Sequence, residues 1–149
     1  MKKIVLAFLL LPALALVSSF APAGGEGFEI YLNNKLVMQK FNADMKKVSV
    51  LQLDQRNAKD QLTLKYHHCG KIGKNRVITV KNENDKILKE WHFADVAAPM
   101  GSMSCNVNEI LSLEKLKANK LNLYYASTEL PEGRLLVTIA LADKSYAAR

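Results

Sequence analysis

The feature that most constrains the fold is a series of short segments in which apolar and polar residues alternate. The clearest case is 61–68, where apolar residues occupy every second position and polar residues occupy the positions between them. Because successive side chains of a strand point to opposite sides, this pattern indicates a strand with one buried face. No strand–helix–strand alternation is present, so a parallel sheet is not expected.

Further segments of this kind follow one another at spacings of roughly ten residues, and most are separated by turn residues. They span residues 28–33, 36–41, 47–54, 76–81, 87–94, 120–127 and 135–141. Asn33-Asn34 suits a two-residue hairpin turn, and Leu130-Pro131-Glu132-Gly133 fits a type I turn. Eight or nine short strands predict an all-β fold, an antiparallel β-sandwich of the immunoglobulin-like or jelly-roll-like kind.

Two segments leave alternatives open. Residues 107–118 carry apolar residues at partly helical spacing behind Asn106 and Asn108, either of which is a suitable N-cap. This segment is therefore one short helix or, alternatively, a strand followed by a turn. In 47–54 the apolar phase shifts between Val50 and Leu51, which predicts a bulge or a crossover at a sheet edge.

The N-terminus has the pattern of a secretory signal peptide. Lys2 and Lys3 precede an uncharged run over 4–17, and Ala21-Pro22-Ala23 supplies an A-x-A cleavage site. The run is too short for a membrane anchor, which needs about 20 apolar residues, and no later run is long enough. We expect residues 1–23 to be removed, with export to the periplasm or the extracellular space. A single domain over 24–143 and a flexible tail over 144–149 then remain, and the formal net charge falls from +7 to +5.

Hydrophobic residues make up 49% and charged residues 23% of the chain, which fits a globular protein and excludes a disordered or collagen-like one. The two cysteines, Cys69 and Cys105, are expected to pair in an oxidising compartment. A disulfide that closes this loop adds roughly 4 kcal/mol to the free energy of unfolding, because it lowers the entropy of the unfolded chain. The alternative is a reactive thiol or a metal ligand.

A basic stretch without acidic residues marks the middle of the chain. Its members are Lys65, His67, Lys71, Lys74, Arg76 and Lys81. If they lie on two neighbouring strands and the loop between them, several project from one surface and attract anions. An exported protein meets envelope phosphates, acidic polysaccharides or acidic protein faces, whereas nucleic acid is not expected there. The alternative is that these lysines keep an edge strand soluble and unpaired.

Three tyrosines are candidates for contacts with a partner. Tyr31 falls on the polar face of its segment, and Tyr124 and Tyr125 are adjacent, so one of the two faces outward in a strand. Surface tyrosines stack on sugars or anchor protein contacts. The alternative is that tyrosine is simply a good strand former.

Metal binding and hydrolysis are the rival functions. His67, His92, Met100 and Met103 are residue types that suit copper or zinc, but their spacing is poor, and the adjacent His67 and His68 point to opposite faces of a strand. A hydrolytic triad would combine Ser102 or Ser104 with His92 and Asp95. Acid–base carboxylates would come from Glu29, Glu90 or Asp95, and no spacing singles out two of them.

The sequence therefore predicts an exported, non-catalytic β-sandwich that binds an envelope or extracellular partner, with an anionic component as one candidate partner. No cofactor is expected. A periplasmic copper- or zinc-binding protein and a small secreted hydrolase remain as alternatives.

Overall fold

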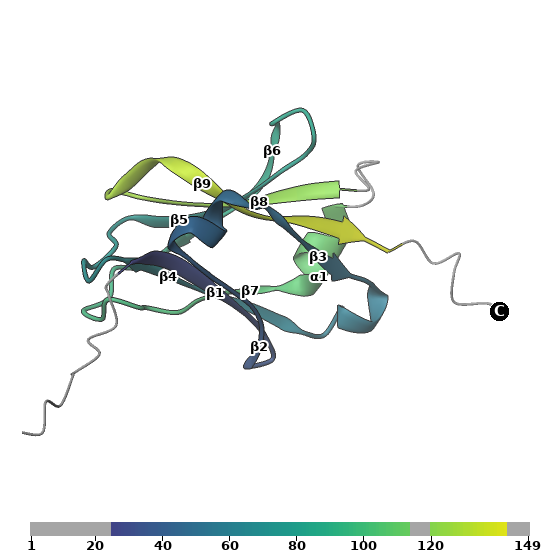
Figure 1. Ribbon diagram of the computed structural model, residues 1–149. Coiled ribbons are helices and arrows are strands. Elements are labelled where there is room, and N and C mark those ends of the chain that lie inside the picture. The colour runs from purple at the N-terminus through teal and green to yellow at the C-terminus, as the bar shows by residue number, and fades with distance from the viewer. Residues whose placement is uncertain (1–24, 114–119, 143–149) are drawn as a thin grey trace, which may run out of the picture.

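The computed structural model describes residues 25–113 and 120–142. The signal peptide expected at 1–23 and the tail expected at 144–149 lie outside the described residues. Within the described part, nine strands form two sheets that pack face to face (Figure 1), which confirms the predicted sandwich. No helix in these ranges has the length and apolar character needed to cross a bilayer.

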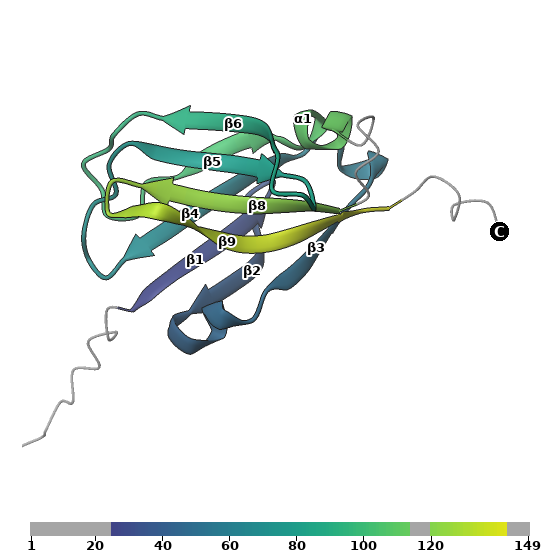
Figure 2. The same ribbon diagram turned by 90° about the horizontal axis from the view of Figure 1, so that it is seen from above.

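The sheets contain four and five strands (Figure 2). The four-stranded sheet has the order β2 (Lys35–Phe41), β1 (Glu26–Leu32), β4 (Gln61–His68) and β7 (Met103–Asn106). The five-stranded sheet has the order β3 (Ser49–Leu53), β9 (Leu130–Leu141), β8 (Lys120–Ser127), β5 (Arg76–Lys81) and β6 (Ile87–Phe93). The neighbouring strands β4 and β5 along the chain thus belong to different sheets.

The first hairpin turns as expected and the last one does not. Asn33 and Asn34 both have positive φ angles, 49° and 64°, as a type I′ turn requires. In the last hairpin Ser127 pairs with Leu130, so the chain turns between them and the turn predicted at 130–133 is wrong. Residues 130–133 instead begin β9, where the register is irregular and Gly133 has a φ angle of 69°. An irregular ladder tolerates the proline and glycine that the sequence offered as turn residues.

One pair of strands is parallel, which the alternation of residues did not predict. The 3₁₀ helix η1 (Asn42–Lys46) carries the chain from β2 in one sheet to β3 in the other, and β3 then runs parallel to β9. Leu51 faces the core, while Val50 points outward with 58% of its surface exposed. The β3–β9 register is unbroken, so no bulge lies at 50–51, and the apolar phase shifts because Val50 lies on the exposed face of this edge strand.

The short helix is confirmed in its first part. Helix α1 (Val107–Leu111) buries Val107, Ile110 and Leu111 against the sandwich, and residues 114–118 lie outside the described part. A second 3₁₀ helix, η2 (Gln55–Asn57), follows β3 and contacts α1.

The core lies between the two sheets and is built from alternate residues of the central strands. Its fully buried members include Phe28, Ile30, Leu62, Leu64, Ile78, Leu121, Leu123, Val137 and Ile139. Burying aliphatic and aromatic side chains of this size stabilises a fold by about 1.5–3 kcal/mol each before entropy is counted. One contiguous core of this kind explains why the chain folds as a single sandwich.

The predicted disulfide is wrong, because Cys69 and Cys105 are both free. Cys105 lies opposite Leu62 at the start of β4, whereas Cys69 follows His68 at its end. The extended strand between Leu62 and Cys69 spans roughly 20 Å, and a disulfide needs Cα atoms within about 7 Å. Burial raises the pKa of the Cys105 thiol to about 12, so this cysteine behaves as a core residue.

Candidate binding face on the four-stranded sheet

The outer face of the four-stranded sheet carries a cluster of polar and aromatic side chains from three strands. Its members are Glu29 and Tyr31 of β1, Gln39 and Phe41 of β2, and Lys65 and His67 of β4. We call this cluster the Glu29 face. The alternation of β1 and β4 places it here, because the residues between these positions fill the core.

The register of the strands brings these side chains together in rows. Glu29 lies between Gln39 on β2 and Lys65 on β4, and Gly27 lies between Phe41 and His67. Because Gly27 has no side chain, the Phe41 ring lies over it and meets the His67 ring edge to face at 5.1 Å between centroids.

Glu29 is the centre of the hydrogen bonds on this face, and only 9% of its surface is exposed. Its carboxylate accepts hydrogen bonds from the Tyr31 hydroxyl at 2.6 Å and from the Gln39 side-chain amide at 3.0 Å. The hydrogen bond to this carboxylate raises the pKa of Tyr31. Nε2 of His67 is buried, lies 3.8 Å from Oε1 of Glu29 and makes no hydrogen bond.

Lys65 provides the ammonium group of the Glu29 face. Its Nζ lies 4.9 Å from the centre of the Tyr31 ring, within the range of a cation–π contact. On the same side, the Thr63 hydroxyl lies 2.8 Å from that of Ser104 on β7. The face thus presents hydroxyl, amide, imidazole, ammonium and aromatic groups on a regular strand framework.

The six basic residues of the sequence analysis do not share one surface. Lys65 and His67 lie on the Glu29 face, whereas Lys81 lies on the outer face of the five-stranded sheet with its Nζ 4.5 Å from the Tyr124 ring centre. Lys71 and Lys74 lie in the loop between β4 and β5. The expectation of one basic patch required β4 and β5 to be neighbours, and the chain crosses between sheets at this loop instead.

Arg76 is a core residue rather than a surface cation, since only 4% of its surface is exposed. Its guanidinium donates hydrogen bonds to the carbonyls of Gly101 at 2.8 Å and Ala94 at 2.7 Å. These bonds hold the loop after β6 against the end of the sandwich.

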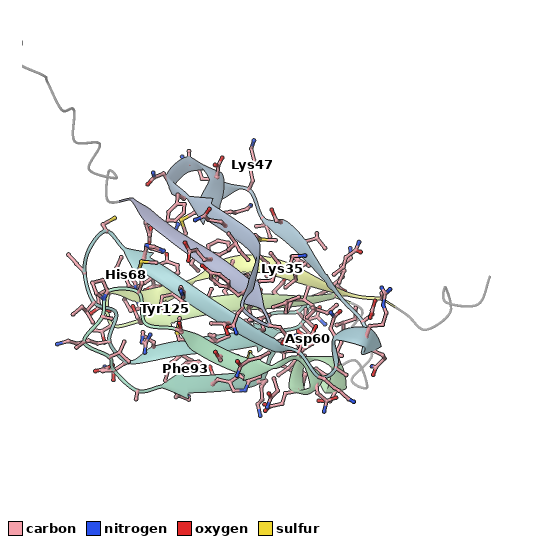
Figure 3. All side chains as sticks on the ribbon, turned by 90° about the horizontal axis from the view of Figure 1, so that it is seen from below. Lys35, Lys47, Asp60, His68, Phe93 and Tyr125 are labelled. Carbon is pink, nitrogen blue, oxygen red and sulfur yellow. The ribbon has the colours of Figure 1, made fainter. Side chains whose placement is uncertain are left out.

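The three candidate tyrosines separate as the alternation requires. Tyr31 and Tyr124 lie on the two outer faces, and Tyr125 is fully buried. Tyr125 stacks on Tyr66 at 4.3 Å between centroids, and its hydroxyl lies 2.9 Å from Nε2 of His68. Figure 3 labels His68 and Tyr125 at the end of the sandwich away from α1. Burial raises the pKa of Tyr125 and lowers that of His68, so this pair is a neutral part of the core.

The candidate metal ligands lie apart. His67 is on the Glu29 face, His92 is exposed on β6, Met100 is in a loop and Met103 is buried in β7. Across residues 25–113 and 120–142, no three His, Cys, Asp or Glu side chains lie close enough to hold one ion.

Two of the candidate hydrolytic groups, Ser104 and His92, lie on different sheets. The Ser104 hydroxyl contacts that of Thr63 on the four-stranded sheet. His92 lies on the five-stranded sheet, with its Nε2 3.9 Å from Oε2 of Glu90. Asp95 accepts a hydrogen bond from the backbone N–H of Asn75 at 2.8 Å. Glu29 and Glu90 lie on the outer faces of different sheets, so they do not form an acid–base pair either.

The sequence predicts Tyr31, Lys65 and His67 as candidate contacts but not the groups that join them. It offers Glu29 only as one carboxylate among several, and it gives no indication of Gln39 and Phe41. The available signal was the alternation in β1, which puts Glu29 on the same face as Tyr31. The partner strand and its register, which supply Gln39 and Phe41, require the structure.

Comparison with known proteins adds no family to this description: no family model matches the chain, and no curated protein is similar to it.

Proposed function

We propose that this protein is an exported, non-catalytic binding module, and that the Glu29 face binds an anionic component of the cell envelope or extracellular space. The observation that carries the proposal is the convergence of Tyr31, Lys65 and His67 on one sheet face around Glu29. Lys65 and His67 belong to the basic stretch and Tyr31 is an exposed aromatic residue, and strand register brings the three together.

The charges on this face favour an anionic ligand. The Glu29 carboxylate accepts hydrogen bonds from Tyr31 and Gln39 and is nearly buried, so a ligand has little direct access to it. Lys65, which lies opposite Glu29 on β4, is the cation that this face offers to a ligand. The flat rings of Tyr31 and Phe41 suit stacking against sugar rings, which makes an acidic polysaccharide the preferred ligand.

The test compares two matched lysines, each in contact with a tyrosine on one outer face. Binding of polygalacturonate, an acidic polysaccharide, is measured by titration calorimetry for the Lys65→Gln and Lys81→Gln variants. We expect Lys65→Gln to weaken binding about tenfold, as loss of one charge-assisted contact does. Lys81→Gln should stay within about twofold, and added salt should weaken the unmodified protein.

An equal loss in both variants would show that the charge of the whole protein, not the Glu29 face, attracts the polymer. Binding to vesicles of an anionic phospholipid but not to polygalacturonate would keep the face and change the ligand. Absence of binding to either probe contradicts the proposal.

A further inference from the structure

Strand β3 is an edge strand without the usual protection against pairing. Within residues 25–113 and 120–142 its one partner strand is β9, and its sequence Ser-Val-Leu-Gln-Leu contains no charge and no proline. Its register with β9 has no bulge. The preceding edge strand β2 contains Lys35 and Lys40 and a register irregularity, which are features that discourage strand addition.

The free side of β3 presents backbone groups in a known phase. The carbonyl of Leu53 accepts a hydrogen bond from the N–H of Ala142 at 3.0 Å, so this residue faces β9. Because successive residues direct their N–H and C=O groups to opposite neighbours, those of Val50 and Gln52 point to the open side. The side chains of Val48 and Val50 are 48% and 58% exposed at the same place.

We propose that β3 pairs antiparallel with β3 of a second copy of this chain, about a two-fold axis at Val50. A two-fold axis perpendicular to the sheet keeps each side chain on its own face of the joined sheet. The residue at the axis then lies opposite the same residue of the second copy. With Val50 opposite Val50, the two residues exchange both backbone hydrogen bonds, and Val48 lies opposite Gln52 of the second copy. The two five-stranded sheets then form one continuous sheet.

Opposite charges flank β3 in this register. With Val50 on the axis, the pairing brings Lys46, the last residue of η1, toward Asp54 of the second copy. Asp54 is bound by the guanidinium of Arg56 of its own chain, 2.6 Å away, so Lys46 would join an existing ion pair. Figure 3 shows Lys47 at the η1 end of β3, with its side chain pointing away from the molecule. A second copy therefore supplies backbone partners for the open side of β3 and an acidic residue near Lys46.

The test measures the oligomeric state of the purified protein by sedimentation velocity over a concentration series. We expect a monomer–dimer equilibrium. Val50→Lys places two like charges on the axis and should raise the dimer dissociation constant at least about tenfold. The matched control is Ile87→Lys, which changes an aliphatic residue that is 52% exposed on β6, the opposite edge of the same sheet. This variant should dimerise like the unmodified protein.

Hydrogen exchange at the backbone N–H groups of Val50 and Gln52 separates the possible occupants of the edge. Protection that rises with protein concentration supports the second copy. Protection that is independent of concentration means that another segment of the same chain covers β3, and this overturns the proposal. A monomer at every concentration, or a dimer that Ile87→Lys dissociates and Val50→Lys does not, overturns it as well.

Discussion

The outer faces of the two sheets carry the same lysine–tyrosine pair and differ in what surrounds it. Lys65 lies over Tyr31 on the four-stranded sheet, and Lys81 lies over Tyr124 on the five-stranded sheet, at 4.9 and 4.5 Å from the ring centres. In both cases the lysine is the diagonal neighbour of the tyrosine on the adjacent strand. Diagonal contacts of this kind are ordinary in sheets, so the pair alone does not mark a binding site.

The carboxylates beside the two pairs make the difference. Glu29 is nearly buried and accepts hydrogen bonds from Tyr31 and Gln39, whereas Glu90 is exposed and accepts one longer bond, 3.2 Å, from Thr79. Glu29 joins its tyrosine to Gln39 on another strand. The pKa of Tyr124, by contrast, is raised by burial and then by Asp85, not by Glu90. The comparison teaches that an organised face is recognised by a shared acceptor rather than by exposed lysines and aromatic rings.

The largest effect is expected where Gly27 lets Phe41 lie flat on the Glu29 face. A Cβ at Gly27 would lie 2.0 Å from Cδ1 of Phe41 and 2.7 Å from the carbonyl oxygen of Lys40. The ring can move but the backbone cannot, so Gly27→Ala should lower the free energy of unfolding by about 1–3 kcal/mol. Urea unfolding measures this, with Ala126→Val on the other outer face as a control expected to change stability by less than about 0.5 kcal/mol. Equal losses would contradict a special role for Gly27.

A smaller effect is expected from removing the central carboxylate. Glu29→Ala leaves the Tyr31 hydroxyl and the Gln39 amide without their acceptor, which should cost about 1–2 kcal/mol of unfolding free energy. Glu90→Ala should change stability by less than about 0.5 kcal/mol, because its side chain is exposed. If the two variants unfold at the same urea concentration, the two faces are organised to the same degree.

The sequence predicted what alternation controls. It placed most of the strands, the hairpin at Asn33-Asn34 and the start of α1, and it put Tyr31, Lys65 and His67 on outer faces. Alternation fixes which face a side chain takes, because a slip by one residue would expose the core. It therefore predicted the sandwich even though the disulfide assumed to stabilise it is absent.

Alternation does not show which strands are neighbours, and the errors follow from this. The basic residues were placed together because β4 and β5 are consecutive, but the chain changes sheet between them. The cysteines were paired because there are two of them, yet they lie toward opposite ends of β4. The parallel pairing of β3 with β9 and the contact between Phe41 and His67 likewise depend on long-range register.

His68, on the core side of β4, should make the stability of the protein depend on pH. Burial lowers the pKa of His68, which contacts Tyr125 and Ser127 inside the sandwich. The unfolded chain then takes up a proton near pH 6.5 that the folded chain does not. Stability should therefore be full above about pH 6.5 and fall as the pH drops below it.

Urea unfolding between pH 7.5 and pH 5 checks this expectation. His68→Asn should lower stability at neutral pH and reduce the loss of stability on acidification, because the histidine whose pKa differs between the folded and the unfolded chain is gone. A pH dependence that His68→Asn leaves unchanged would mean that another group takes up the proton.

The smallest effect is a change in the titration of a single tyrosine, and it tests the hydrogen bond that distinguishes the two faces. The Glu29 carboxylate raises the pKa of Tyr31, because ionising the phenol removes the proton that Tyr31 donates and places two negative charges side by side. Glu29→Gln should therefore lower the pKa of Tyr31 toward its ordinary value of about 10. The pKa of Tyr124 is raised mainly by burial, so Glu90→Gln should leave it unchanged. NMR titration of the tyrosine ring signals measures both, and a Tyr31 pKa that ignores Glu29→Gln would mean that this hydrogen bond does not organise the face in solution.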